Sequence, residues 1–393
     1  MFNYACKKDK NQDASDPNPR GSVIGAPTTL NTYPKAFIAL ALSTILGNNV
    51  PAVQLTYDVE LIKIDYYTID PAGNPAEASG LLILPVNATA ALPLLSYQHG
   101  TILSKLNAPS KLQGGYEVGL VFGSEGYAVA CPDFLGLGDG SKLHPYLHAK
   151  SEATAVIDML RAVRSVCKGK NVVLNDQLFL MGYSQGGHVT MATLKAIEEE
   201  YSSEFNVTAC APMAGPYDLS GTQLNYMLRD SAYPDPAYLP YLLFAYNNVY
   251  NLYSDLSSAF VAPYYDDFKA YFNDNPSSEL SVVDKLWPSS MIPIAVLNPV
   301  LVQGLKENQN DPLKLALKEN DLYDWAPKSP LHICHCDSDK HVPFQNSTLA
   351  YSSFISHGSS SVQLIMPLHG GTHITCAAPS FIHALTWFDS LKK

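Results

Sequence analysis

One serine stands between two glycines in the segment 182–187, which reads GYSQGG. An apolar run at 177–181 precedes it, and a stretch with helical spacing follows from His188 to about Glu199. A strand, a sharp turn and a helix form the setting in which the pattern G-x-S-x-G exposes a nucleophilic serine. The turn strains the backbone of the serine, so the residues two positions away on each side must lack bulk. The segment therefore predicts Ser184 as a nucleophile, with acyl transfer as its chemistry.

A nucleophilic serine of this kind works with an acid and a base, and two later segments supply candidates for both. A buried-strand pattern at 330–336 runs into the loop DSDKHVP at 337–343. A second apolar run at 362–366 ends in PLHGGTH at 367–373, and a helix pattern then covers about 379–391. The chain order serine, acid, histidine is the one used by α/β-hydrolases, and it differs from two other well-known orders of this triad.

Each of these two loops offers a choice between two residues. We expect Asp339 rather than Asp337 to be the acid, because D-x-x-V-P after a late strand is the acid loop that this fold usually carries. We expect His373 rather than His369 to be the base, because it lies one turn beyond the strand end and just before the helix. Asp337 and His369 are then solvated or turn-capping residues.

A further part of the predicted site follows the strand pattern at 92–97, which ends in QHGT at 98–101. In α/β-hydrolases an N–H group from this loop and the N–H of the residue after the nucleophile bind the oxyanion. The expected donors are therefore the backbone N–H groups of Thr101 and Gln185. A simple strand-ending turn is the alternative reading of the loop.

The composition is that of a globular protein, with 393 residues, 47% hydrophobic and 16% charged. A formal net charge of −11 argues against a nucleic-acid partner, which needs clustered Lys and Arg. No segment has the roughly 18 continuous apolar residues of a membrane span. The predicted chemistry requires neither a cofactor nor a metal. His144 and His148 lack a third ligand at suitable spacing, so we expect them to be structural, and Asp133 to stabilise a turn.

The seven cysteines show neither C-x-x-C nor metal-ligand spacing. Cys334 and Cys336 lie two apart on a predicted strand, so both are expected to face one side of the sheet as buried thiols. One disulfide is compatible with the count, and the sequence does not assign it.

Residues 1–19 are polar and are expected to form a disordered tether. Within them, Cys6 is followed by two lysines and a flexible spacer, which resembles the mature start of an exported lipoprotein of the Bacteroidetes type. Either the export signal is truncated in this sequence or the resemblance is accidental; if the resemblance holds, Cys6 is the expected site of a lipid anchor. We favour an exported protein, whether periplasmic, attached to the outer membrane or secreted.

Strand and helix patterns alternate along most of the chain. Strands are predicted at 57–70, 76–84, 127–132 and 205–213, and a helix at 149–166. This alternation predicts an α/β fold, with a mostly parallel sheet covered by helices on both faces.

The alternation stops between residues 215 and 324, a segment that holds half of the 24 tyrosines. Its apolar spacing predicts short helices. It lies between the serine and the acid, where α/β-hydrolases carry a cap over the active site. Most of its aromatic residues are expected to pack the insert's own core, and a few to line the substrate pocket. We therefore predict a catalytic domain of residues 20–214 and 325–393 and a cap of residues 215–324.

Several segments together resemble the secretory-lipase branch of the α/β-hydrolases and related bacterial secreted esterases. They are YQHGT at 97–101, PDFLGLG at 132–138, HPYLHAKSEA at 144–153 and GYSQGGH at 182–188. With the acid and histidine loops they cover the chain from about residue 50 to its end, although the cap is not matched well. The second and third segments are the diagnostic ones.

This resemblance implies Ser184 as the nucleophile, Asp339 as the acid and His373 as the base. Cys336 departs from the pattern, because many members have glycine before the acid loop.

The residues and the resemblance together predict a serine hydrolase that cleaves small-molecule or polymer-linked carboxylic esters, as a carboxylesterase or a lipase. One alternative is a peptidase of the same fold that acts on N-terminal residues, for which Asp266 and Asp267 would bind the substrate amine. A second is a binding protein that keeps the fold without the chemistry.

Overall fold

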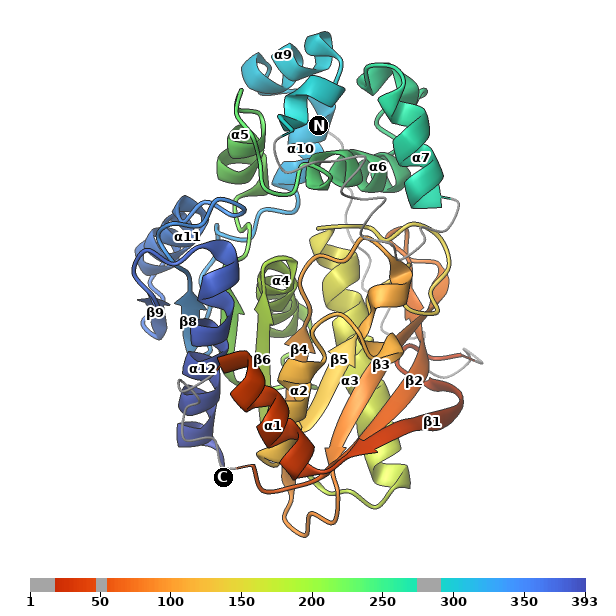
Figure 1. Cartoon of the computed structure of the whole chain (residues 1–393), viewed down its shortest axis with the longest axis vertical. Helices are drawn as coiled ribbons and strands as arrows, with labels where there is room; N and C mark the ends of the chain where they lie inside the picture. The colour runs from red at the N-terminus through yellow and green to blue at the C-terminus, as the bar shows by residue number, and fades with distance from the viewer. Residues whose placement is uncertain (1–17, 47–54, 274–290) are drawn as a thin grey trace.

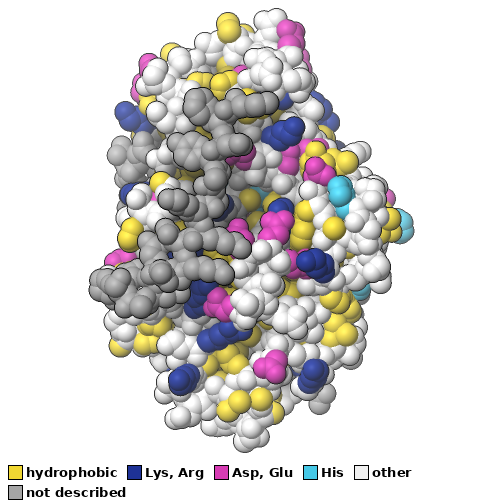
Figure 2. Space-filling view, turned by 180° about the vertical axis from the view of Figure 1, so that it is seen from behind, with side chains coloured by type: hydrophobic (Ala, Val, Ile, Leu, Met, Phe, Trp, Pro, Cys, Tyr) yellow, Lys and Arg dark blue, Asp and Glu magenta, His cyan; other side chains and the backbone are white. Residues whose placement is uncertain are grey.

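A computed structural model of the chain describes residues 18–46, 55–273 and 291–393 (Figure 1). Cys6 and residues 1–17 of the tether predicted over 1–19 lie outside the described residues. In the described part of the chain, no helix is both long and apolar enough to cross a membrane. Figure 2 shows acidic and basic side chains interspersed over one face of the molecule.

The described strands form one nine-stranded sheet in the order β1-β2-β3-β5-β4-β6-β7-β8-β9. The strands from β5 to β9 in this order pair in parallel, whereas β1, β2 and β3 form an antiparallel edge. Their bounds are β1 Val23–Tyr33, β2 Val59–Ile69, β3 Pro75–Pro85, β4 Leu92–Gln98, β5 Ala128–Pro132, β6 Leu174–Tyr183, β7 Val207–Met213, β8 Leu331–Cys334 and β9 Val362–Ile365.

Helices cover both faces of this sheet, as the alternation of strand and helix patterns predicts (Figure 1). One face carries α1 (Lys35–Leu46), α2 (Glu117–Ser124) and α12 (His373–Leu391). The other carries α3 (Ala149–Gly169), α4 (Gln185–Glu200) and α11 (Gln345–Ser356). Neighbouring strand residues enter opposite cores: Leu178 packs under α3 and α4, and Phe179 packs under α12. Burial on both faces explains why the central strands are continuous apolar runs.

The segment predicted as a cap forms short helices that lie together at the top of Figure 1. They are η4 (Leu219–Gln223), α5 (Leu224–Met227), α6 (Tyr238–Tyr250), η5 (Leu256–Ala259), α7 (Tyr264–Asn273), η6 (Pro293–Val296), α9 (Pro299–Glu307) and α10 (Pro312–Lys318). Two more short turns, η2 (Lys105–Asn107) and η3 (Pro109–Lys111), precede α2. Most of the buried aromatic residues of the insert form their own cluster, which also takes in Tyr146 and Leu147 from the loop before α3, whereas Tyr217 packs in the core of the sheet.

The structure corrects the predicted start of the C-terminal helix. α12 begins at His373 and not near Pro379, which lies inside the helix. Thr372 caps the helix, because its side chain accepts a hydrogen bond from the N–H of Thr375 and the Thr375 side chain accepts one from the N–H of Thr372. A proline in a sequence favours the first turn of a helix, but this capping box starts the helix earlier.

Candidate active site

Ser184 forms the sharp turn between β6 and α4. Its backbone has φ 61° and ψ −121°, a conformation that a non-glycine residue adopts only under local constraint. Its N–H donates to the carbonyl of Met213 at 2.9 Å, which holds the turn against β7. A Cβ at Gly182 would collide with the carbonyl oxygen of Gly186, and one at Gly186 with the carbonyl oxygen of Gln98. Both glycines are therefore required by the close approach of backbone at this turn.

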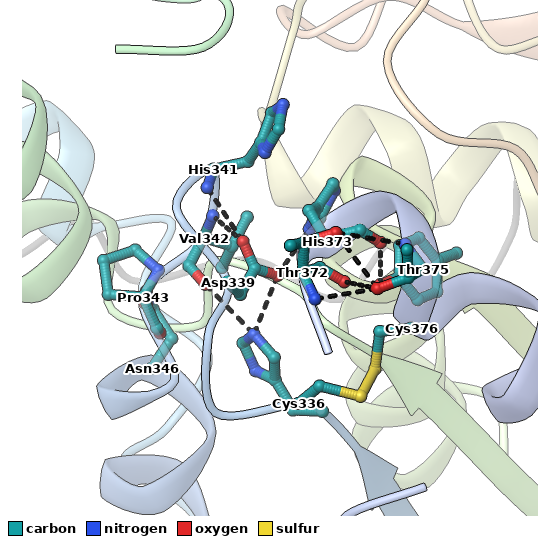
Figure 3. A network of polar contacts seen from close by, with 12 residues as sticks. Cys336, Asp339, His341, Val342, Pro343, Asn346, Thr372, His373, Thr375 and Cys376 are labelled. Atoms are coloured by element: carbon teal, nitrogen blue, oxygen red, sulfur yellow. Dashed lines mark hydrogen bonds and ion pairs between the residues drawn. A yellow bond between two sulfur atoms is a disulfide. The ribbon is translucent and has the colours of Figure 1, made fainter. Parts of the chain in front are cut away.

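Asp339 and His373 form a buried pair (Figure 3). Tyr183, the residue before Ser184, contacts His373 and so places this pair near the turn. The Nδ1–H of His373 donates to Oδ2 of Asp339 at 2.5 Å. Oδ1 of Asp339 accepts from the N–H groups of His341 at 2.8 Å and Val342 at 2.9 Å. The structure thus brings together two of the residues predicted from the sequence. The two backbone N–H groups hold the carboxylate by Oδ1, the oxygen that does not bind His373.

His335 is a third partner of the carboxylate, and it was not predicted from the sequence. Its Nε2–H points at Oδ2 of Asp339, 3.1 Å away, and at the carbonyl of Val342, 3.0 Å away. Its Nδ1 accepts from the hydroxyl of Ser347 at 2.7 Å. Burial alone would raise the pKa of Asp339, but the hydrogen bonds from His335 and His373 outweigh it and hold that pKa well below its usual range. The only sequence signal was a histidine four residues before the acid.

His373 is buried between the turn at Ser184 and the loop that carries Asp339. Burial lowers its pKa, and the partly opposing hydrogen bond and charge of Asp339 do not restore it. Its backbone carbonyl accepts from the hydroxyl of Tyr183 at 2.6 Å, and the two rings lie 5.0 Å apart. Among the described residues, no hydrogen bond joins the side chains of Ser184 and His373; such contacts are often long before substrate binds.

A second imidazole, His341, stacks on His373 with 4.7 Å between ring centroids. Its Nε2 lies 2.7 Å from Oδ2 of Asp235, which belongs to the insert. One ligand atom each from Asp339, His341 and His373 lies within 4.8 Å of the others, a spacing that metal sites also show. Because Asp339 and His373 already share a short hydrogen bond, we interpret the trio as an acid–base pair with a neighbouring imidazole.

A small cavity, of about 20 Å³, lies between the turn at Ser184 and the insert. Ser184, Gln185 and Val342 line it together with apolar and aromatic residues of the insert, including Leu219, Leu224, Met227, Tyr233 and Leu242. About one water fits into this volume. Asp266 and Asp267 lie in the first turn of α7 and are not among its lining residues.

Of the two expected oxyanion donors, Gln185 directly follows Ser184, and Thr101 follows a glycine that approaches Ser184. Gly100, which precedes Thr101, approaches the nucleophile so closely that a Cβ there would lie 3.7 Å from the Cβ of Ser184. The side-chain oxygen of Thr101 lies 3.0 Å from the hydroxyl of Tyr146. Gln185 is the first residue of α4, where backbone N–H groups have no partner within the helix. In the part of the chain that the structure describes, neither backbone N–H donates to another protein group.

The residues predicted to be structural make structural contacts. Asp337 accepts from the N–H of Gly370 at 2.6 Å, and the His369 side chain is 86% exposed. Buried Asp133 accepts from the hydroxyl of Ser79 at 2.6 Å and from the N–H of Ser110 at 2.8 Å.

His148 caps α3, and its Nδ1 lies 2.9 Å from the hydroxyl of Ser151. His144 bonds to the carbonyl of Leu135 at 2.7 Å. Among the residues that the structure describes, the group of side chains spaced as in a metal site, Asp339, His341 and His373, includes neither of these two histidines.

The expectation that Cys336 is a free buried thiol is wrong, because Cys336 and Cys376 form a disulfide. β8 ends at Cys334, so Cys336 lies beyond the strand and is not held on the same face of the sheet. Cys334 stays a buried free thiol, as predicted. The disulfide joins the segment three residues before Asp339 to the helix turn three residues after His373 (Figure 3).

Replacing Cys336 and Cys376 together by alanine is expected to lower the free energy of unfolding by about 2–5 kcal/mol. The bond closes a loop with a sequence separation of 40 residues, and its loss frees that loop in the unfolded chain. Urea unfolding of the double variant tests this, with Cys167→Ala, a buried free thiol on α3, as the control. Equal losses in the two proteins would show that the crosslink adds no stability of its own.

Comparisons with known proteins agree with this architecture. The family model described as Secretory lipase matches residues 111–391. The chain is similar to Lipase 5 of Candida albicans, with 24% identity over 380 residues that cover 90% of this chain and 78% of that protein. A solved structure from Legionella pneumophila has a TM-score of 0.85 and 26% identity, over 94% of this chain and 98% of that one.

The rice cell wall degrading esterase LipA from Xanthomonas oryzae is 30% identical, with a TM-score of 0.79, and the match covers 95% of this chain and 96% of that one. The mostly parallel sheet, the helices on both of its faces and these matches identify the α/β-hydrolase fold. The chain belongs to the secretory lipase family and is a carboxylic ester hydrolase.

Proposed function

We propose that the chain hydrolyses esters through a Ser184–His373–Asp339 triad and an acyl-enzyme intermediate. The observation that carries this proposal is the 2.5 Å hydrogen bond between His373 and Asp339, which lies beside the strained turn of Ser184. A buried carboxylate that accepts from Nδ1 leaves Nε2 of the imidazole as the basic nitrogen.

In the proposed reaction, Ser184 Oγ bonds to the ester carbonyl carbon while His373 Nε2 takes its proton. Asp339 holds the imidazole in this tautomer and stabilises the imidazolium. The backbone N–H groups of Thr101 and Gln185 bind the oxyanion of the tetrahedral intermediate. The imidazolium then protonates the leaving alcohol. Water attacks the acyl-enzyme by the same steps, and the acid is released with Ser184 restored.

The substrate in this proposal is a small-molecule or polymer-linked ester, bound beneath a cap of residues 215–324. The side chains that line the cavity beside Ser184 are largely apolar, among them Leu224, Met227 and Leu242, and apolar side chains are the kind that contact an acyl chain. The similarity to a cell wall degrading esterase supports including polymer-linked esters.

Hydrolysis of p-nitrophenyl acetate, butyrate, octanoate and palmitate tests the proposal, with amino-acid p-nitroanilides beside them. Rates that fall with chain length would identify a carboxylesterase, and a maximum at long chains a lipase. Turnover of anilides alone would favour the peptidase alternative, for which Asp266 and Asp267 give no support because they do not line the cavity. A fluorophosphonate that fails to label the protein would contradict the serine mechanism.

We further propose that the protein is exported. Its family is a family of secretory lipases, and disulfides such as Cys336–Cys376 persist in oxidising compartments outside the cytosol. A periplasmic, outer-membrane or fully secreted location, and the lipid anchor at Cys6, stay predictions.

The pH dependence of kcat/KM is expected to follow the neutral form of His373, because only the neutral imidazole accepts the serine proton. Burial lowers the pKa of His373 below its ordinary value of 6.5. A lowered pKa keeps the base neutral in more acidic solution, so the acid limb of the profile should have its midpoint below pH 6.5. The measurement is the initial rate with p-nitrophenyl acetate between pH 4 and pH 9. A midpoint above pH 7 would contradict this assignment of the base.

A further inference from the structure

Next to the turn at Ser184 lies a buried carboxylate, which the proposed mechanism does not use. Glu152 belongs to α3, and none of its side chain is exposed. Its Oε1 accepts from the side-chain N–H of Gln185 at 2.7 Å and from the backbone N–H of Leu147 at 3.1 Å. Its Oε2 lies 3.2 Å from Nδ1 of His188 on α4. Glu152 lies within the HPYLHAKSEA segment, for which no role in catalysis was predicted from the sequence.

The side-chain amide of Gln185 is held by a second acceptor. Its Nε2 lies 2.7 Å from Nε2 of His144. Nδ1 of His144 faces the carbonyl of Leu135 at 2.7 Å, so the ring proton is on Nδ1 and Nε2 is free to accept. Each hydrogen of the amide thus has one acceptor, and the side chain of Gln185 is buried. A side chain fixed in this way also restricts the rotation of its own backbone.

The carboxylate of Glu152 is also connected, through His188, to Asn320 near the C-terminal end of the insert. Nε2 of His188 lies 3.1 Å from the carbonyl of Asn320, so both ring nitrogens of His188 face acceptors. The side chain of Asn320 accepts from the N–H of Ala149 at 2.8 Å and donates to the hydroxyl of Tyr250 at 2.9 Å. Burial alone would raise the pKa of Glu152, but its contacts with His188, His144 and Gln185 outweigh that effect and lower it. Glu152 is therefore a charged anchor in the interior.

We propose that Glu152 is a positioning residue for the oxyanion site. Its carboxylate binds the side chain of Gln185 and thereby orients the backbone N–H of Gln185 toward the developing negative charge. The inference rests on the proposed function, in which that N–H is an oxyanion donor. Gln185 directly follows a serine with positive φ, so its backbone lies at a strained junction where an anchored side chain resists rotation. Glu152 itself does not touch the reacting atoms.

The decisive variant is Glu152→Met, which keeps the length of the side chain and removes the acceptor. We expect kcat for p-nitrophenyl butyrate to fall about 10- to 100-fold, less than the loss of a whole oxyanion donor, while KM stays within about 2-fold. A trifluoromethyl ketone, to which a serine adds to give a tetrahedral oxyanion, should bind more weakly by the same factor as kcat. Glu152→Gln keeps an acceptor for Gln185 and should retain most of kcat.

Asp158→Leu is the matched control. Asp158 lies on the same helix, its side chain is equally buried, and it accepts from Arg20 at 3.0 Å, Thr68 at 2.7 Å and Arg161 at 2.7 Å. Removing it should lower the melting temperature and leave kcat per active site within about 2-fold. Titration of active sites with a fluorophosphonate corrects every rate for the folded fraction.

Gln185→Met tests the same contact from the other side, so the proposal stays testable even if the Glu152 variant does not fold. It removes the amide that Glu152 holds, so it should reduce kcat and ketone affinity to the same extent. Combining Glu152→Met with Gln185→Met should add little, because both changes break the same contact.

If wild-type turnover depends on Ser184 but Glu152→Met and Gln185→Met keep kcat and ketone affinity within 3-fold, the positioning role is wrong and the proposed function stands. If the wild type is neither labelled by the fluorophosphonate nor dependent on Ser184, both proposals fall.

Discussion

Ser184→Ala is expected to lower ester turnover by about 10⁶-fold, because it removes the atom that forms the acyl-enzyme. The fold should persist. Alanine meets the same backbone strain at φ 61° as serine does, and the turn is held by the backbone bond to Met213 and by the two flanking glycines. Steady-state hydrolysis of p-nitrophenyl butyrate and a circular dichroism melt of the same preparation test both statements.

Ser338→Ala is the control for this experiment. Ser338 lies on the acid loop with an exposed side chain, and its contact to Gly371 is made by the backbone N–H, which alanine keeps. Its turnover should equal that of the wild type. Retention of more than a thousandth of the wild-type rate by the purified Ser184 variant would rule out Ser184 as the nucleophile.

Asp339→Asn should have the second-largest effect, a fall in kcat of about 10⁴-fold, as expected when an asparagine replaces the acid of such a triad. The amide can donate to Nδ1 of His373 and so favours the tautomer in which Nε2 carries the proton. That imidazole cannot accept the proton of Ser184. In the wild type, the Nε2–H of His335 points at Oδ2 of Asp339, 3.1 Å away. An amide N–H at that position would face this second donor instead of accepting from it.

Asp337→Asn provides the comparison for this variant, two residues away on the same loop. Asp337 accepts from the N–H of Gly370, and the asparagine side-chain oxygen preserves this contact. Activity close to that of the wild type is expected. If Asp337→Asn were the inactive protein and Asp339→Asn the active one, the acid would have been assigned to the wrong residue.

The sequence was sufficient where chemistry and local structure depend on neighbours along the chain. The glycines around Ser184 and the apolar runs of the central strands predicted a sharp, strained turn at Ser184 and a mostly parallel sheet, and the structure has both. Val342 and Pro343, which follow Asp339 at fixed spacing, were the reason to predict Asp339 rather than Asp337 as the acid, and in the structure it is Asp339 that pairs with His373.

Contacts between segments that are distant along the chain could not be predicted from the sequence. The disulfide brings Cys336 to Cys376 only after β8 and α12 have packed on the sheet. Glu152 meets Gln185 from another helix, and nothing in the HPYLHAKSEA segment identifies a carboxylate as buried. The start of α12 was misplaced for a different reason: the capping box at Thr372 outweighs the preference of Pro379 for a first turn.

The separate aromatic core of the insert has a consequence for how specificity can evolve in this chain. The predicted catalytic residues lie on turns, loops and helix starts near the strand ends. In contrast, Leu219, Leu224, Met227 and Leu242 belong to helices of the insert that pack among themselves. Mutations in those helices can reshape the space above Ser184 without changing the core of the sheet. Duplicated copies of such a gene could therefore diverge in substrate while the acid, the base and the nucleophile stay unchanged.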